Sequence, residues 1–269
     1  MKFVCTLVLG LCANALMAED TLLSNDESVA LASDIVMQEE NGRGAGGIWL
    51  LGAQYGSQSL LYNNTDDEKG PMPMLAYLGQ HFFWKGYELG YQLNPMGSPS
   101  NMVFSIEAMA YEVDLGDSDD DNMSLLDERD ASVMASFVYQ TGPFEMKFSQ
   151  DVSNEHLGFS MGLGIKNTYD LAPFEVELGA GLAYQDKKLS HHLYGVSQSE
   201  SNSTSGDIAA YDAGSSQILE VSVAVNYSIT QKAKVGVEIG RSDYLGIDDS
   251  PIVDTDHTIG SKVSFIYMF

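Results

Sequence analysis

The sequence predicts an all-β protein, a transmembrane antiparallel up-and-down β-barrel of about twelve strands, with ten strands as the alternative. Strand-like segments of about ten residues recur from residue 44 to the end of the chain, each with one apolar and one polar face. No apolar run approaches the roughly 20 residues that a membrane helix needs. The chain also ends on an aromatic residue, Phe269, at the close of such a segment.

The strand candidates alternate between apolar and polar residues along most of their length. They are 49–55, 71–78, 81–85, 87–93, 102–113, 131–140, 144–150, 157–166, 174–185, 219–227, 235–240 and 258–269. Two prolines open the segment 71–78, where a missing backbone donor costs least. Gly86 separates the third segment from the fourth, and fusing the pieces between 71 and 93 gives the ten-strand alternative. In the fifth segment, the expected lipid-facing residues are Phe104, Ile106, Ala108 and Ala110.

The last segment defines the two faces of the predicted wall. Its lipid-facing residues are expected to be Ile259, Val263, Phe265, Tyr267 and Phe269. Only Ile266 and Met268 interrupt the opposite, polar face. An amphipathic strand that closes on an aromatic residue resembles the assembly signal of bacterial outer-membrane barrels, and here that signal comprises Phe265, Tyr267 and Phe269.

The start of the chain predicts secretion. A basic residue at position 2, an apolar stretch at 3–11 and small residues at 13–18 indicate a cleaved signal peptide spanning 1–18. Both cysteines leave with it, so a mature thiol or disulfide is not expected. Residues 19–43 form an acidic segment expected in the periplasm, either as a short helix or as a disordered tail, and the barrel spans 44–269.

The lengths of the connections predict which end of the barrel faces out. If the last strand runs towards the periplasm, the short turns near 94–100, 141–143, 171–173 and 230–231 lie on the periplasmic side. The long, acidic connections 56–70, 114–130, 186–215 and 246–257 then lie outside, as is typical of such barrels. Six inward-facing glutamates need water or a lysine partner to avoid an uncompensated buried charge. They are Glu107, Glu145, Glu175, Glu177, Glu220 and Glu238, and the expected partners are Lys147, Lys166 and Lys262.

The charge of the chain excludes one class of partner. With 13 basic and 38 acidic side chains, its formal charge is −25. Phosphate binding needs the opposite sign, so nucleic acid is not an expected partner. Solubility in a salty habitat explains the excess of acidic residues at least as well as any specific binding role does.

One acidic stretch fits the ligand spacing of a calcium loop. Asp117, Asp119 and Asp121 are followed by Glu128, eleven positions after the first of them. Asn122 stands where such a loop needs glycine, and flanking helices are not expected. The competing interpretations are a solvated acidic loop and loose divalent bridging to lipopolysaccharide.

The same loop region contains residue types that hydrolases use. His191, His192, Ser197 and Glu200 lie close together in the sequence, but spacing within a loop does not define a nucleophile and its base. We therefore predict no catalytic site and no cofactor.

Several short motifs resemble the MipA/OmpV family of outer-membrane proteins. They are His-Leu-Tyr-Gly-Val-Ser at 192–197, Tyr-Asp-Ala-Gly at 211–214 and Asp-Ser-Pro-Ile-Val at 249–253, followed by the Phe269 ending. The resemblance is strongest from 174 onwards and continues weakly back to 44. The motif residues that carry it are Tyr194, Gly195, Val196, Tyr211, Ser250 and Pro251. The segment 54–59 keeps only part of the family's pattern after the first strand, which puts any role of the first outer loop in doubt.

The resemblance implies an outer-membrane scaffold rather than an enzyme. In that family, an adaptor joins a lytic transglycosylase to a peptidoglycan synthase, so that the cutting and building of murein are coupled. The implied partners are therefore a periplasmic murein hydrolase and a peptidoglycan synthase, together with outer-membrane lipid and lipopolysaccharide. The alternatives are a small, cation-selective outer-membrane pore or a surface antigen.

Overall fold

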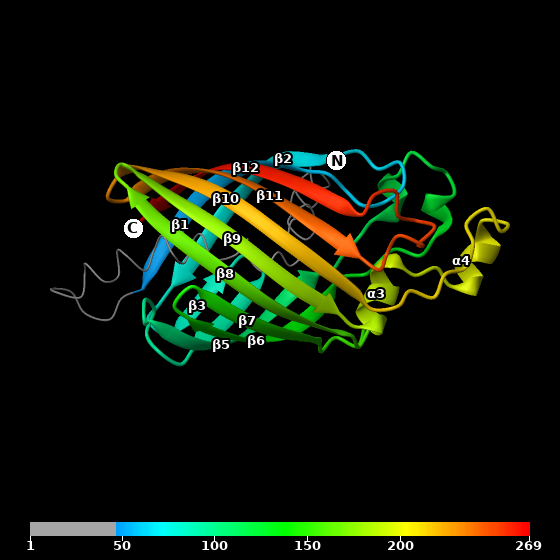
Figure 1. Cartoon of the computed structure of the whole chain (residues 1–269), viewed down its shortest axis with the longest axis horizontal. Coiled ribbons are helices and arrows are strands. Elements are labelled where there is room, and N and C mark those ends of the chain that lie inside the picture. The colour runs from blue at the N-terminus through cyan, green and yellow to red at the C-terminus, as the bar shows by residue number, and fades with distance from the viewer. Residues whose placement is uncertain (1–46) are drawn as a thin grey trace, which may run out of the picture.

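Twelve antiparallel strands close into a single barrel in the computed structural model, which describes residues 47–269 (Figure 1). Each strand pairs with its neighbours in sequence, and β1 pairs with β12 to close the wall. The strands are β1 (Ile48–Gln58), β2 (Glu68–Leu78), β3 (Phe82–Lys85), β4 (Glu88–Gln92), β5 (Ser100–Ala110), β6 (Ser132–Thr141), β7 (Phe144–Asp151), β8 (Phe159–Leu171), β9 (Phe174–Gln185), β10 (Ser216–Thr230), β11 (Ala233–Leu245) and β12 (His257–Met268). The predicted fold class and the count of twelve strands are confirmed.

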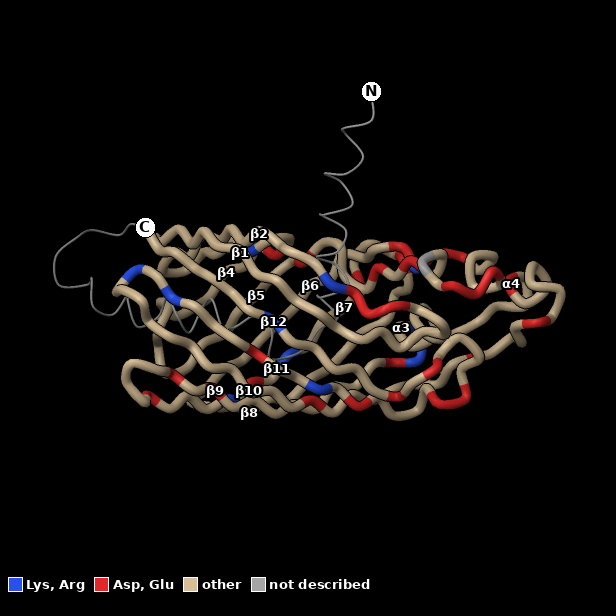
Figure 2. The backbone as a smooth tube through the Cα atoms, turned by 90° about the horizontal axis from the view of Figure 1, so that it is seen from above, with Lys and Arg blue, Asp and Glu red and all other residues tan. Residues whose placement is uncertain are grey.

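The connections differ in length at the two ends of the barrel. At the turn end, the strands are joined by 79–81, 93–99, 142–143, 172–173 and 231–232. At the loop end, they are joined by 59–67, 111–131, 152–158, 186–215 and 246–256. This is the arrangement that the sequence predicts. Figure 2 shows that Asp and Glu gather on the connections of the loop end.

Within residues 47–269, the helices lie in the connections of the loop end. They are α3 (Lys187–Tyr194), α4 (Gln198–Ser203) and two 3₁₀ helices, η1 (Leu115–Asp117) and η2 (Met123–Leu125). Asp186 caps α3 by accepting a hydrogen bond from the backbone of Leu189. Within residues 47–269, no helix is long and apolar enough to span a membrane.

The side chains of β12 show how the wall is built. Val263, Phe265 and Tyr267 face outwards and are 43–51% exposed, whereas the inward-facing Ser264 is 7% exposed. The two residues that interrupt the polar face, Ile266 and Met268, are buried inside the barrel. An outward apolar band around a closed sheet is what contact with lipid requires.

Two strand predictions need correction. Ala110 was expected to face lipid but is buried, because the ladder between β5 and β6 shifts register between Glu107 and Ala110 and Met109 has φ +64°. This bulge exchanges the two faces of the strand and ends it before residue 113. In addition, β2 begins at Glu68, so Pro71 and Pro73 lie inside the strand and not at its start.

Residues 1–46 lie outside the described part of the chain. The signal peptide 1–18 and the acidic segment 19–43 remain predictions from the sequence.

Candidate functional site: the loop cap and the lumen

The connections of the loop end pack into one apolar cluster with the inward-facing ends of several strands. We call the connections 59–67, 111–131, 186–215 and 246–256 the loop cap. Its buried apolar residues include Leu61, Tyr62, Leu115, Met123, Leu126, Leu189, Leu193, Tyr194, Val196, Ile208, Ile247 and Ile252. They contact a cluster that also holds Met134, Ala183, Ile218 and Tyr244 from β6, β9, β10 and β11. The loop cap is therefore continuous with the inner face of the wall.

Hydrogen bonds join the separate connections of the loop cap. The side-chain amide of Asn63 donates to the backbone carbonyl of Pro251 over 2.8 Å. The hydroxyl of Ser118 donates to the carbonyl of Asn63 over 2.7 Å. The hydroxyl of Tyr62 reaches the carbonyl of Leu193 over 3.4 Å. The connection 59–67 is thus bonded to each of the other three connections of the loop cap, 111–131, 186–215 and 246–256.

A buried ion pair joins the connections 111–131 and 186–215 directly to each other. Arg129 donates from Nη1 to Glu200 Oε1 over 2.7 Å, and its Nη2 donates to the carbonyl of Gly195 over 2.8 Å. Glu200 also accepts from the backbone of Ser197, whose hydroxyl accepts from the backbone of Glu200, so the two residues form a capping box at the start of α4. Burial raises the pKa of Glu200, but the hydrogen bonds from Arg129 and Ser197 outweigh it, and the net pKa lies below the usual range.

All six family-motif residues lie in this cap. Tyr194 is fully buried, and its carbonyl accepts a hydrogen bond from the hydroxyl of Ser250 over 2.7 Å. Val196 and Tyr211 exchange backbone hydrogen bonds of 2.9 and 2.8 Å. At Gly195, a Cβ atom would lie 2.3 Å from Nδ1 and 2.4 Å from the carbonyl oxygen of His191. The side-chain amide of Asn63 also donates to the carbonyl of Pro251. Together, these contacts hold the six motif residues in one packed region of the cap.

Sequence reasoning missed Arg129, although it contacts two of the connections that contain the motifs. The available signal was its position, since it is the only basic residue within the acidic stretch 114–130. A single cation in such a stretch needs an explanation, and here it neutralises a buried carboxylate.

The residues of the proposed calcium loop do not converge on one point in the described part of the chain. The side chains of Asp119, Asp121 and Glu128 are exposed, and that of Asp117 lies outside the description. Among the described residues, no group of three or more His, Cys, Asp or Glu side chains is placed to hold a metal ion.

The residue types that resemble a hydrolase site have other contacts in the structure. Ser197 and Glu200 form the capping box of α4. His192 lies against the ring of His156, with ring centroids 5.0 Å apart. Burial lowers the pKa of His192 to about 4, and the neighbouring His156 and Arg129 act in the same direction. His192 is thus held neutral in the interior of the cap.

Ion pairs line the lumen below the cap. Lys166 lies 2.8 Å from Glu177, and Lys262 lies 2.7 Å from Glu238. Glu175 pairs with Lys234 over 3.6 Å. Lys166 and Lys262 therefore act as the sequence predicted, while Lys234 was not anticipated. Two of these pairs connect neighbouring strands, β8 with β9 and β11 with β12, whereas the Glu175–Lys234 pair reaches from β9 past β10 to β11.

A second apolar cluster lies inside the barrel at the turn end. It contains Leu50, Leu78, Phe83, Met96, Ile266 and Met268, together with Ile48 and Ala76. It explains why Ile266 and Met268 depart from the polar pattern of β12, because their side chains pack against those of β1, β2 and β3. The interior thus has apolar packing at both ends and ion pairs between them.

The chain matches a protein family along most of its length. The family model described as MltA-interacting protein MipA matches residues 51–269. The MltA-interacting protein of Escherichia coli (strain K12) is 25% identical over 233 residues, covering 84% of this chain and 92% of that protein. The outer membrane protein OmpV of Vibrio cholerae is 25% identical over 251 residues, covering 88% and 93%.

Among solved structures, the CymD monoaromatic hydrocarbon channel aligns with a TM-score of 0.42 at 9% identity, covering 92% of this chain and 93% of that one. The relatives above and the closed barrel place this chain in the outer membrane. Because the family model spans all strands from β2 to β12 and most of β1, the chain belongs to the family of the MltA-interacting protein MipA.

Proposed function

We propose that this protein is an outer-membrane scaffold that binds a murein hydrolase at its periplasmic end and links it to a peptidoglycan synthase, without catalysis of its own. The first half is supported by relatives in Escherichia coli and Shigella flexneri, each named MltA-interacting protein and 25% identical over 233 residues. The link to a synthase rests on the family resemblance.

The packing inside the barrel favours a scaffold function and argues against a diffusion pore. Conduction requires a continuous polar path, whereas this lumen has packed apolar clusters at both ends. Between them, three glutamates of the wall, Glu175, Glu177 and Glu238, each pair with a lysine. We therefore expect the purified protein to be silent in a planar bilayer, and a steady cation-selective conductance would favour the pore.

The observation that carries the proposal is the shape of the turn end. The β7 strand pairs with β8 only as far as Ile165, yet β8 continues to Leu171. The tip of the β8–β9 hairpin, residues 167–174, therefore extends past the β6–β7 turn, as Figure 1 shows at the left of the molecule. All of its residues are exposed. A projecting tip with both faces accessible is a surface that a periplasmic enzyme can contact.

The test is a pull-down of the tagged, folded full-length protein from gently crosslinked cells, read by mass spectrometry. We expect to recover a lytic transglycosylase and a peptidoglycan synthase. Recovery should fall in a Tyr169→Ser, Leu171→Ser double variant of the tip, or when residues 19–43 are deleted. A matched control at the opposite end, Ser199→Ala with Asn202→Ala in α4, should leave recovery unchanged.

Two outcomes contradict parts of the proposal. Full recovery with both the tip variant and the deletion would show that the contact lies elsewhere. Recovery of neither enzyme from the unmodified protein would refute the scaffold, and bilayer conductance would then decide whether the protein is a pore.

A further inference from the structure

The hydrogen-bond ladder of the wall is interrupted next to β2. The two strands that follow it, β3 and β4, have only four and five residues. β3 pairs with β2 solely at Ala76, Tyr77 and Leu78, so the edge of β2 from Lys69 to Met74 has no strand partner on that side among the described strands. The β3–β4 turn ends at this level, where the backbone of Gly86 donates to the carbonyl of Leu75.

The open edge of β2 carries the two prolines of the strand. Backbone groups of residues two apart point to the same side of a strand. The carbonyl of Leu75 points towards β3, so Pro73 and Pro71 present their backbone nitrogens to the open side. Neither has an N–H, which means that another strand cannot form a regular ladder there. This edge therefore disfavours a protein strand as its occupant.

The open edge lies within the lipid-facing band of the barrel. Pro71 is opposite Tyr55 of β1, which is 56% exposed, and Pro73 is opposite Ala53, which in turn pairs with the outward-facing Phe265 of β12. Hydrocarbon chains are thus the surrounding medium at this height. An edge without donors costs less in hydrocarbon than one with unsatisfied N–H groups.

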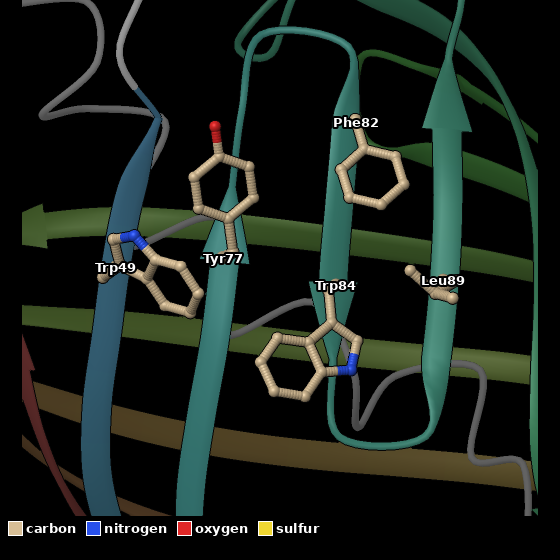
Figure 3. A pocket seen from close by; sticks show the side chains of 5 residues that line it. All are labelled: Trp49, Tyr77, Phe82, Trp84 and Leu89. Carbon is tan, nitrogen blue, oxygen red and sulfur yellow. The ribbon is translucent and has the colours of Figure 1, made fainter.

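A concave pocket lies on the outer face, on the turn-end side of this edge, where β2 is still paired with β3. It has a volume of about 450 Å³ and is lined by Trp49, Tyr77, Phe82, Trp84 and Leu89. Figure 3 shows these side chains on one side of strands β1 to β4. The ring centroid of Trp49 lies 5.1 Å from that of Tyr77 and 6.3 Å from that of Trp84. The lining is therefore a continuous aromatic surface.

The pocket belongs to the turn-end half of the wall. The backbones of Trp49 and Phe269 exchange hydrogen bonds of 3.1 Å at the end of the chain. At the other limit, Trp84 donates from its indole nitrogen to the carbonyl of Gly86 over 2.8 Å, at the β3–β4 turn. The lengths of the connections predict that the turn end faces the periplasm. This half of the wall is then expected to contact the inner leaflet, which consists of phospholipid.

We propose that this pocket is a binding site for one phospholipid of the inner leaflet, with an acyl chain seated on the aromatic surface and continuing along the proline edge of β2. The inference is independent of the proposed scaffold function. It assigns a ligand to the one sector of the wall whose strands are too short to span the apolar band, since four or five residues cover only about 13–17 Å.

The chain provides its own probe, because Trp49 and Trp84 are its only two tryptophans. The full-length protein is reconstituted in vesicles with increasing fractions of a phospholipid brominated on its acyl chains, which quenches indole fluorescence on contact. We expect half-maximal quenching at a severalfold lower fraction than for a tryptophan on ordinary lipid-facing wall. That control is Phe144→Trp, an exposed position of β7 at the same end of the barrel, in a Trp49→Phe, Trp84→Phe background.

A second variant separates binding from simple lipid exposure. Leu89→Phe fills part of the pocket without changing its polarity, and it should move the quenching curve of Trp49 and Trp84 to that of the control. Native mass spectrometry in mild detergent should detect one retained phospholipid on the unmodified protein and none on this variant. Coincident curves for the pocket and the control, or lipopolysaccharide as the retained lipid, would overturn the proposal.

Discussion

The guanidinium of Arg129 lies 2.7 Å from the carboxylate of Glu200, and both side chains are buried between the connections 111–131 and 186–215. Arg129 also bonds to the carbonyl of Gly195, which follows α3 directly. One cation therefore joins the end of α3, the start of α4 and the connection after β5.

Replacing Arg129 with alanine should loosen the loop cap. The change leaves the carboxylate of Glu200 buried without its partner, which typically costs about 3–5 kcal/mol. Hydrogen exchange at the backbone amides of α4 should report the loss as faster exchange. The matched control is Arg241→Ala, since Arg241 pairs with Asp243 at an exposed position where such pairs contribute little. Equal effects of the two variants would contradict a structural role for the buried pair.

The stability of the cap should fall on mild acidification. His192 has a pKa of about 4 in the folded protein and an ordinary value of 6.5. Between these values the unfolded cap binds a proton that the folded cap does not, so the stability is fully present above pH 6.5 and falls as the pH drops towards 4. The free energy of unfolding of the cap should fall by at most about 1.4 kcal/mol for each pH unit of acidification through this group.

Burial also lowers the pKa of His156, opposed by Asp151 and Asp186, so the two histidines act in the same direction. The protection factors of the α3 amides, which correct for the intrinsic pH dependence of amide exchange, should therefore fall as the pH is lowered across this range. A His192→Gln variant should show a weaker pH dependence. If it kept the full dependence, His192 would not be its source.

Gly195→Ala should strain the cap, because the new Cβ would lie 2.3 Å from Nδ1 and 2.4 Å from the carbonyl oxygen of His191. Part of this contact is with backbone, so relief requires a shift of the α3 end, at a cost of about 1–3 kcal/mol. Gly214→Ala is the control in the same connection, since a Cβ there has open space. Thermal unfolding, followed by migration on gels, should separate the two variants, and equal midpoints would contradict the steric account.

Restoring backbone donors to the open edge of β2 should make the barrel associate. The Pro71→Thr, Pro73→Thr double variant presents two N–H groups to hydrocarbon, and pairing with the same edge of a second copy satisfies them. Crosslinking in vesicles should then detect dimers that the unmodified protein does not form. Leu163→Thr on β8 adds a polar side chain to a strand paired on both sides and should remain monomeric. Dimers in both variants would show that polarity and not the edge is responsible.

The candidate site shows where sequence reasoning reaches its limit. The motif residues Tyr194, Val196 and Ser250 stood out as short patterns, but the sequence did not indicate that Ser250 bonds to the carbonyl of Tyr194 across 56 positions. Contacts between loops depend on the spatial order of the strands that carry them. The bulge at Met109 was missed for a related reason, since a positive φ at a non-glycine residue leaves no periodic signal.

The sequence by itself determined the barrel, a strand number of about twelve, and the face that most strand residues turn to lipid. These follow from local rules, because alternation with a period of two sets the face of each residue and a wall in lipid must close. Only the tertiary structure decided what lies inside and between the strands. The Arg129–Glu200 pair, the apolar clusters at both ends and the proline edge beside short β3 and β4 arise from residues distant in sequence. Their proximity is set by strand register and closure, which a single strand's pattern does not encode.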